Sequence, residues 1–251
     1  MLSVPGRSLV VIPTVDEASN IVEVLERVRQ AAPTADVLVV DGASRDGTPD
    51  LVEQVGRELG QIRVLRQPER NGLGGAYRSG FAKGLAEAYD VLVEMDADLS
   101  HDPAALPSLL EAVEAGARLA IGSRYVPGGG TPGWPRRRRL LSIGGNTYAN
   151  LVLGLHVHDA TAGYRAYRAQ TLHDIDYAST HADGYGFQVE MAYRVVRTGG
   201  GIVERPITFQ DRTRGTSKMS GRIVVEAMLL VTWWGIRDRI FRRTDPALRR
   251  T

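Results

Sequence analysis

The chain has 251 residues, 24% charged side chains and a formal net charge of +2 at pH 7. This length can bury a large core, so we expect one α/β domain with room for a C-terminal extension. The absence of cysteine excludes disulfides, thiolate metal sites and a cysteine nucleophile, and it suits a reducing compartment. Residues 1–8 contain an arginine but no apolar core of the length that a signal peptide needs.

Strand and helix patterns alternate through the first half of the chain. In order, they predict a strand at Ser8–Ile12, a helix at Asn20–Ala31, a strand at Asp36–Val40, a helix at Thr48–Leu59, a strand at Ile62–Arg66, a helix at Gly75–Ala88, a strand at Val91–Met95, a helix from Asp102 to about Glu114 and a strand at Leu119–Gly122. Thr48 and Asp102 each precede a proline, as a capping residue does at the start of a helix. This rhythm predicts an α/β fold with a mostly parallel sheet and flanking helices, whose ligands bind beyond the carboxyl ends of the strands.

The second half is less regular and begins with Pro127–Pro135, where glycine and proline predict a mobile loop. We then expect a helix from about Leu140 to Leu153, irregular structure around Asp159–Tyr167, a helix at Phe187–Arg197, a strand at Ile202–Phe209, a polar basic loop at Asp211–Ser220 and a final apolar helix. We assign residues 1–220 to the α/β domain. Residues 221–251 form a C-terminal amphipathic helix and basic tail, suited to contact with a membrane surface or a partner.

Polar residues gather at the predicted carboxyl ends of the strands. Asp96 and Asp98 follow a buried strand, where carboxylates are costly unless a cation lies beside them. Proteins hold Mg²⁺ and Mn²⁺ with one or two carboxylates plus substrate phosphates, so the pair predicts a metal site that handles a nucleotide diphosphate. Such a pair can also be a solvated helix cap, but the surrounding residues favour the metal site. Other strands bring further residues to the same edge: Pro13, Glu17, Asp41 and Arg124.

Several motifs in a fixed order carry a family resemblance. Three segments resemble the family-2 glycosyltransferases with a GT-A fold: Ile12–Asn20, Val39–Thr48 and Met95–His101, the last of which reads Met95-Asp96-Ala97-Asp98-Leu99-Ser100-His101. Further segments narrow the resemblance to the polyprenyl- and dolichyl-phosphate mannosyltransferases, also called polyprenol monophosphomannose synthases: Gly72–Tyr77, Gly122–Tyr125, Gly184–Met191 and Asp211–Lys218. The resemblance spans roughly residues 8–220, and the combination is far more specific than any single motif.

The resemblance implies transfer of mannose from GDP-mannose to a polyprenyl phosphate, with inversion at the anomeric carbon. It also implies a nucleotide pocket lined by the segments that contain Pro13, Val15, Glu17, Val40, Asp41 and Gly42. The donor and metal site corresponds to Asp96, Ala97 and Asp98, with Asp96 and Asp98 as ligands of Mg²⁺ or Mn²⁺. The basic residues that contact the donor diphosphate or the acceptor phosphate correspond to Arg124, Arg212 and Lys218.

Three positions depart from the family pattern. Val15 stands where the family usually has tyrosine, Gly42 where it has a second aspartate, and Arg70 where it has lysine. The first two lie in the expected nucleoside pocket. They leave open a donor such as UDP-glucose or another sugar nucleotide.

The acceptor of this reaction is a phosphate that is already anionic, so it needs positioning more than a strong general base. Arg124, together with Arg138 or Arg139, is the candidate acceptor site, although the run Arg136–Arg139 fits a solvated face equally well. Asp98 and Arg124 are the candidate catalytic residues. Asp159 matches an acidic residue that related inverting enzymes place near the acceptor, and it is a third candidate. The five histidines show no metal-ligand spacing and are expected in structural or surface roles.

The C-terminal region predicts contact with a membrane rather than a span across it. The apolar stretch Ile223–Ile236 is interrupted by Glu226 and is shorter than the about 20 residues that a transmembrane helix needs. Trp233 and Trp234 fit an interfacial helix as well as they fit packing on the core. The basic clusters predict an anionic membrane surface or a phosphorylated lipid, and no nucleic acid, because no aromatic platform is interleaved with them. We expect a peripheral protein at the cytoplasmic face of the membrane, which reaches its lipid by a peripheral helix, by basic patches or by a membrane-bound partner protein.

Two other classes of protein compete with this interpretation. A sugar-nucleotide pyrophosphorylase would need a glycine-rich, basic N-terminal loop, which residues 13–20 do not supply. A non-catalytic scaffold would have no use for Asp96 and Asp98 together with Arg124. Both alternatives are weaker than a glycosyltransferase.

Overall fold

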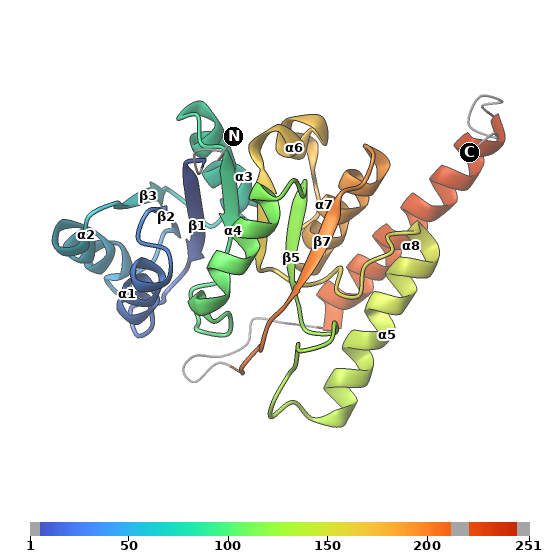
Figure 1. Ribbon diagram of the computed structural model, residues 1–251. Helices are drawn as coiled ribbons and strands as arrows, with labels where there is room; N and C mark the ends of the chain where they lie inside the picture. Colours follow the sequence, from blue (N-terminus) through green and yellow to red (C-terminus); the bar gives the residue numbers. More distant parts are fainter. Residues whose placement is uncertain (1–5, 212–220, 245–251) are drawn as a thin grey trace.

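The computed structural model describes residues 6–211 and 221–244, and in the second range it describes the side chains of residues 225–240. Figure 1 shows the arrangement of the elements. In chain order these are β1 (Ser8–Thr14), α1 (Ile21–Ala31), β2 (Asp36–Gly42), α2 (Thr48–Leu59), β3 (Ile62–Gln67), α3 (Gly72–Ala86), β4 (Val91–Glu94), the 3-10 turn η1 (Pro103–Ala105), α4 (Leu106–Glu114), β5 (Leu119–Ser123), α5 (Arg136–Leu153), β6 (Arg165–Arg168), α6 (Ala169–Asp174), the 3-10 turn η2 (Tyr177–Ser179), α7 (Gly184–Arg197), β7 (Ile202–Pro206) and α8 (Gly221–Thr244).

One seven-stranded sheet runs through the centre of the molecule, in the order β3-β2-β1-β4-β6-β5-β7. All neighbouring pairs are parallel except the two that involve β6, which runs antiparallel to β4 and β5. The carboxyl ends of β1, β2, β4 and β5 therefore meet at one edge. This confirms the mostly parallel α/β sheet expected from the sequence.

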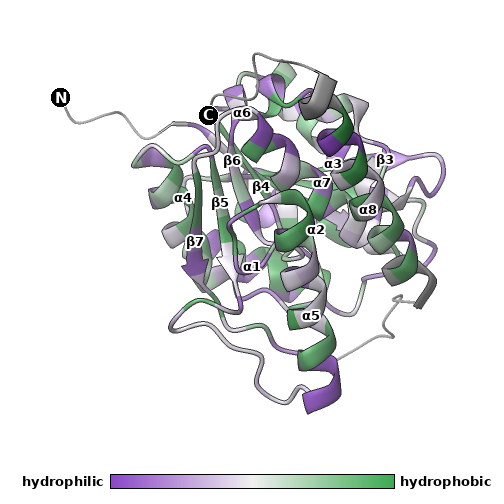
Figure 2. Cartoon of the chain, turned by 90° about the vertical axis from the view of Figure 1, so that its right-hand side faces the viewer, coloured by the Kyte–Doolittle hydropathy of each residue, from purple (hydrophilic) through white to green (hydrophobic). Residues whose placement is uncertain are grey.

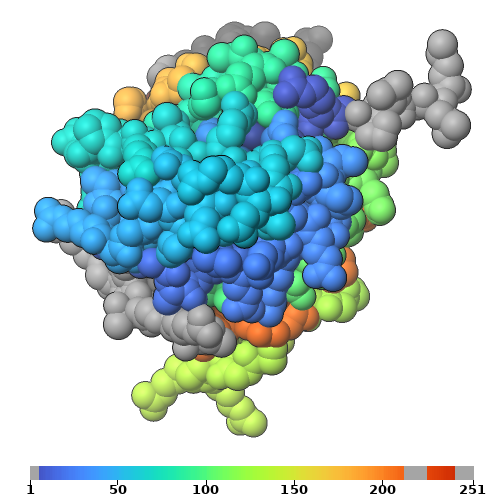
Figure 3. Space-filling model, turned by 90° about the vertical axis from the view of Figure 1, so that its left-hand side faces the viewer, coloured from blue at the N-terminus to red at the C-terminus, as the bar shows by residue number. Residues whose placement is uncertain are grey.

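Helices cover both faces of the sheet because successive strand residues point to opposite sides. In β1, Val10 and Ile12 join a core with α1, α2 and α4, while Leu9 and Val11 join a second core with α3, α6 and α7. Figure 3 views the face that α1, α2 and β3 form, coloured blue to cyan. Because the sheet is packed on both faces, the residues at its carboxyl edge are held in fixed positions relative to one another.

All elements expected between residues 8 and 122 form, with small shifts at their ends. The predicted cap at Asp102 is confirmed, because its side chain accepts a hydrogen bond from Ala104 N at 3.0 Å. The cap predicted at Thr48 is wrong: Gly47, at φ +85°, occupies that position, and the Thr48 hydroxyl donates to Asp46 instead. Glycine adopts this left-handed conformation without steric cost.

The largest error in the predicted elements is β6, which lies where irregular structure was expected. Two of its four residues are arginines, and this polar content hides the strand pattern. Arg165 is nevertheless fully buried, and its guanidinium donates to the backbone carbonyls of Ala160 and Ala162 at 2.7 Å each. Its charge is thus satisfied inside the core by local carbonyls, which alternation of polar and apolar residues cannot reveal.

Two further boundaries differ from expectation. The helix expected from Leu140 begins at Arg136, so the arginine run forms the first turn of α5. The strand expected to reach Phe209 ends at Pro206, and Phe209 instead forms an isolated antiparallel bridge with His101. Within residues 6–211 and 221–244, no helix is long and apolar enough to cross a membrane.

Close packing of α3 on β1 gives a stability prediction. A Cβ added at Gly80 would lie 2.3 Å from Val11 Cγ1, so Gly80→Ala should lower the free energy of unfolding by about 1–3 kcal/mol despite its better helix propensity. Gly144→Ala in α5 is the matched control, because a Cβ there meets nothing within 4 Å. It should stabilise by up to about 1 kcal/mol. Urea denaturation measures both, and equal effects of the two variants would contradict this account of the packing.

Candidate active site

A cavity of about 770 Å³ opens at the carboxyl edge of the sheet. This size is typical of sites for small ligands. Its lining comes from the ends of β1, β2 and β4, the N-terminal ends of α3 and α7, the region between β5 and α5, and α8. Among the residues singled out from the sequence, the cavity is lined by Pro13, Val15, Glu17, Gly42, Arg70, Asp96, Ala97, Asp98, Arg124 and Arg138.

Val15 and Gly42 face each other at the β1–β2 end of the cavity. A Cβ added at Gly42 would lie 3.0 Å from Val15 Cγ2, so the two departures from the family pattern are in contact. The wall that they form is small and apolar. Arg70 also lines this end, and its guanidinium forms an ion pair with Asp16 at 2.7 Å.

Val40 and Asp41 lie behind this wall and do not line the cavity. Val40 is fully buried in the core that contains α3. The Asp41 carboxylate accepts hydrogen bonds from the Thr14 hydroxyl at 2.9 Å and from Ser44 N at 3.0 Å. The position of Asp41 thus supports the loop that shapes the pocket.

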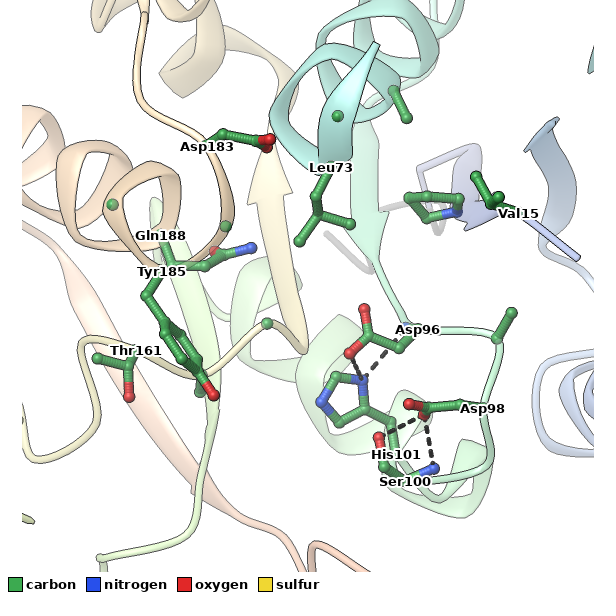
Figure 4. Close-up of a pocket in the computed structure, with 18 of the residues that line it drawn as sticks. Val15, Leu73, Asp96, Asp98, Ser100, His101, Thr161, Asp183, Tyr185 and Gln188 are labelled. Carbon is green, nitrogen blue, oxygen red and sulfur yellow. Dashed lines mark hydrogen bonds and ion pairs between the residues drawn. The ribbon is translucent and has the colours of Figure 1, made fainter. Parts of the chain in front are cut away.

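Asp96 and Asp98 both line the cavity, directly after β4 (Figure 4). Ser100 donates its backbone N–H at 3.0 Å and its hydroxyl at 2.6 Å to Asp98 Oδ1, which fixes the carboxylate within a tight turn. The Tyr77 hydroxyl donates to Asp96 Oδ1 at 3.4 Å. Burial raises the pKa of Tyr77 well above its usual value, so this phenol remains a neutral donor. The two carboxylates are therefore oriented by hydrogen bonds before any ligand binds.

His101 is a site residue that the spacing of histidines did not reveal. It is buried, lines the cavity, and its Nδ1 lies 3.2 Å from Asp96 N, which donates to it. Its ring stacks on Tyr164 and meets Phe209 edge to face. His101 thus fixes the backbone at Asp96 and packs the cavity lining against Tyr164 and Phe209.

Arg124 is held by Asp159 in a buried, bidentate ion pair. Asp159 is fully buried and accepts from Arg124 N, Nε and Nη2 at 3.0, 2.7 and 2.6 Å. Thr161 accepts a further bond from Nη2 at 2.9 Å. These bonds leave out Nη1, and Arg124 lines the cavity whereas Asp159 does not. The geometry makes Asp159 a positioning residue for Arg124 rather than a group that reaches a ligand.

The surroundings of Arg124 keep it charged. Burial opposes the charge, but the hydrogen bonds and the negative charge of Asp159 outweigh it and raise the pKa of Arg124. The guanidinium carbon also lies 5.3 Å from the ring centre of Tyr125 and 5.5 Å from those of Trp134 and Phe209. These aromatic faces add cation–π attraction. The result is a fixed positive charge at the cavity wall.

A second cation, Arg138, lines the cavity near Trp134. Its guanidinium lies 4.0 Å from the Trp134 ring centre and forms an ion pair with Asp211 at 2.5 Å. Arg139 is exposed on α5 and does not line the cavity. Of the two acceptor candidates in the run, Arg138 is therefore the better placed. The candidates Arg212 and Lys218 lie outside the described residues.

The N-terminal ends of α3 and α7 form the remaining wall. Asp183 precedes α7, and its carboxylate accepts a hydrogen bond from Gly74 N of α3 at 2.7 Å. Helix α3 therefore begins at Gly72, three residues before the predicted start at Gly75, and a distant carboxylate accepts a hydrogen bond from its first turn. Four further lining residues were given no role from the sequence: Trp134, Asp183, Tyr185 and Gln188. Tyr185 and Gln188 lie in the Gly184–Met191 segment of the family resemblance, whereas no motif singled out Trp134 or Asp183.

The Arg124–Asp159 pair yields the second stability prediction. Asp159→Asn should lower the free energy of unfolding by about 3–5 kcal/mol, because it leaves a buried guanidinium without its counter-charge. Glu23→Gln, which breaks the exposed pair with Arg27, is the control and should cost only about 0.3–0.5 kcal/mol. Urea denaturation separates the two. A cost below about 1 kcal/mol for Asp159→Asn would mean that the pair does not fix Arg124.

Comparison with known proteins identifies the family. Residues 9–176 match the family described as Glycosyl transferase family 2. The chain is 52% identical over 233 residues to the undecaprenyl-phosphate mannosyltransferase of Micrococcus luteus, covering 93% of this chain and 96% of the relative. It is 48% identical over 237 residues to the polyprenol monophosphomannose synthase of Mycolicibacterium smegmatis, and the alignment covers 94% of this chain and 89% of that relative. A dolichol-phosphate mannosyltransferase of Pyrococcus furiosus is 33% identical over 241 residues, and the alignment covers 93% of this chain and 66% of that relative.

Solved structures with the same fold are more distant in sequence. Glucosyl-3-phosphoglycerate synthase from Mycobacterium tuberculosis in complex with phosphoglyceric acid aligns with a TM-score of 0.66 and 21% identity, over 90% of this chain and 79% of that chain. The same enzyme in complex with Mn²⁺, UDP-glucose and phosphoglyceric acid aligns with a TM-score of 0.68 and 20% identity, over 92% of this chain and 80% of that chain. These likenesses confirm the GT-A fold. With the family match across two thirds of its length and relatives near 50% identity, the chain belongs to glycosyl transferase family 2.

Proposed function

We propose that this protein transfers mannose from GDP-mannose to a polyprenyl phosphate, with inversion at the anomeric carbon. The observation that carries the proposal is a cavity with two oriented carboxylates on one wall and a fixed arginine on another. This arrangement suits a reaction between two phosphate-bearing substrates. The names of the relatives from Micrococcus luteus and Mycolicibacterium smegmatis support mannose as the sugar and a polyprenyl phosphate as the acceptor.

Asp96 and Asp98 would hold the divalent ion. Both offer carboxylate oxygens to the cavity, which are the ligands that Mg²⁺ and Mn²⁺ prefer. Among the described side chains, those of residues 6–211 and 225–240, no group of three potential ligands gathers, so the diphosphate and water would complete the coordination. When bound, the ion would offset negative charge on the leaving nucleoside diphosphate. The Mn²⁺ and UDP-glucose bound by the structurally similar synthase support a divalent ion and a sugar nucleotide as ligands of this fold.

Arg124 would bind the acceptor phosphate, with Arg138 beside it. A guanidinium binds phosphate oxygens through charge-assisted hydrogen bonds, and Asp159 fixes the one on Arg124 in advance. Preorganisation of this kind lowers the cost of bringing two anions together for attack on the anomeric carbon. The lipid phosphate needs no proton removed, so a site without a histidine base is sufficient.

An apolar surface near the cavity would place the protein on a membrane. On α5 it comprises Leu140, Leu141, Ile143 and Leu151, and on α8 it comprises Val225, Met228, Leu229, Trp233, Ile236 and Ile240, all of them exposed. The two helices pack together, with a hydrogen bond of 2.6 Å between the Tyr148 and Thr232 hydroxyls, and Figure 2 shows apolar stretches on both. We call these residues the α5–α8 face. Glu226, Ala227 and Leu230 of α8 line the cavity itself, so the face adjoins the site.

The charges beside the α5–α8 face suit anionic lipid. Arg136–Arg139 form the first turn of α5, where positive charge opposes the helix dipole. A cost of this kind is offset if the arginines contact an anionic surface. We place the protein peripherally at the cytoplasmic face, and a membrane-bound partner protein could strengthen the attachment.

Binding of nucleotides tests the donor site. We expect calorimetry to show GDP binding that requires Mn²⁺ and exceeds UDP binding, and Asp98→Asn to weaken it by more than about tenfold. Asparagine keeps an oxygen for the Ser100 hydrogen bonds but loses the charge that the ion needs. Unchanged GDP affinity in Asp98→Asn would remove the metal assignment. A preference for UDP would keep the site but move the donor to UDP-glucose or another sugar nucleotide, and binding of neither would favour a scaffold.

Sedimentation with vesicles tests the membrane surface. Trp233→Glu should reduce binding to anionic vesicles by about tenfold, because it places a charge in the apolar face. Leu59→Glu on α2 is the matched control, since Leu59 is also exposed but lies far from α5 and α8 (Figure 1). Equal vesicle binding by the two variants would show that the α5–α8 face does not contact lipid.

A further inference from the structure

Gln188 is a buried polar residue in the wall of the cavity that the proposed reaction has not yet used. It lies in the first turns of α7, is 2% exposed, and lines the cavity. In Figure 4 its amide points from α7 toward the space between Leu73 and Asp96. A glutamine amide carries two N–H donors and one acceptor oxygen, so it can bind a hydroxyl from either side.

The buried Glu94 holds this amide in place. Gln188 Nε2 donates to Glu94 Oε2 at 2.8 Å, which engages one of its two N–H groups. Arg165, also fully buried, donates to the backbone carbonyl of Gln188 at 2.7 Å. Both the side chain and the backbone of Gln188 are thereby fixed. Glu94 fixes the side-chain amide, and Arg165 fixes the backbone carbonyl of the same residue.

The hydrogen bonds of this network are incomplete within the described part of the chain. Gln188 Oε1 has no hydrogen-bond partner there, and neither has Glu94 Oε1. Buried polar atoms without partners are uncommon in folded proteins and often mark a binding site. A ligand hydroxyl at the cavity wall is a group that could complete the bonds of the Gln188 amide.

Gly163 keeps open the space beside the amide. A Cβ added there would lie 3.7 Å from Gln188 Nε2 and 3.9 Å from Asp96 Oδ2. The amide nitrogen and a carboxylate of the proposed metal site therefore flank one small gap in the lining. A sugar hydroxyl fits such a gap between a donor and an acceptor, whereas an apolar group does not.

The order of groups along the cavity indicates which part of the donor reaches this gap. Figure 4 shows Val15 on one side of Asp96 and Asp98, and Gln188 on the other. A nucleotide sugar with its base near Val15 and its diphosphate at the two aspartates would extend its hexose toward Gln188. On the strength of the proposed function, the gap between Asp96, Gly163 and Gln188 is then a subsite for the hexose.

We propose that Gln188 hydrogen-bonds a hydroxyl of the transferred hexose and that Glu94 is the positioning residue that fixes its amide. The pair selects the sugar rather than the nucleotide. Its loss should therefore affect recognition of GDP-mannose and leave recognition of GDP intact.

The test compares two affinities in each variant. Calorimetry with Mn²⁺ gives the ratio of GDP-mannose affinity to GDP affinity for the wild type, Gln188→Leu and Gly163→Ala. We expect both variants to keep GDP affinity within about twofold and to lower the ratio by about tenfold, as loss of one ligand hydrogen bond does. Gln170→Leu, an exposed glutamine on α6 that bonds Asp174, is the matched control and should leave the ratio unchanged.

Gly163→Ala keeps the inference testable if Gln188→Leu fails to fold. The contacts of its added methyl, at 3.6 Å or more, are ordinary ones, so it fills the gap without straining the chain. The role of Glu94 is tested by two variants. Glu94→Gln should retain a higher ratio of GDP-mannose affinity to GDP affinity than Glu94→Leu, because it keeps an acceptor for the Gln188 amide. An equal ratio in Glu94→Gln and Glu94→Leu would exclude the positioning role of Glu94.

An unchanged ratio in Gly163→Ala and in folded Gln188→Leu would overturn the sugar subsite. An equal loss of GDP and GDP-mannose binding would also overturn it, since it would show a purely structural role. If the wild type binds UDP and UDP-glucose in place of the GDP pair, the proposed donor is wrong. The same ratio measured with the UDP pair then decides the role of Gln188.

Discussion

The ion pair between Asp159 and Arg124 is the interaction on which the arrangement of the site depends. It joins the end of β5 to the segment before β6. Asn146 of α5 donates its side-chain amide to the Asp159 carboxylate at 3.4 Å, and the Asp159 backbone N–H donates to the Glu204 carboxylate of β7 at 2.9 Å. The orientation of α5 beside the sheet is thus coupled to the position of a guanidinium. Because the pair is buried, its bonds act at low dielectric and hold the cation in one place.

The cavity lining carries opposite charges at the ends of two different strands, and this separation is a consequence of the topology. Parallel strands deliver Asp96 and Asp98 from β4 and Arg124 from β5 to the same edge, with β6 between them in the sheet. The carboxylates can bind a cation with one substrate's phosphates, while the arginine binds the phosphate of the other. The antiparallel β6 spaces the two groups, and it leads from the segment that contains Gly163.

The sequence predicted regular features well and buried polar contacts poorly. Short apolar runs between helix patterns located β1 to β5, and the strand ends correctly brought Pro13, Asp98 and Arg124 to one cavity. The sequence patterns could not show that Arg165 lies inside a strand or that Asp159 forms its ion pair with Arg124. Those facts depend on which distant atom completes each hydrogen bond, as does the role of Gln188. Periodicity and motif spacing contain no information about such partners.

The most direct test of the proposed reaction is to follow labelled mannose from GDP-mannose into lipid. The protein is incubated with Mn²⁺ and with anionic vesicles that contain a polyprenyl phosphate, and the lipid is then extracted. The account predicts labelled polyprenyl-phosphate mannose that forms only with the divalent ion and the lipid phosphate present. Label that stays in the aqueous phase, or a lipid product formed from UDP-glucose alone, would contradict it.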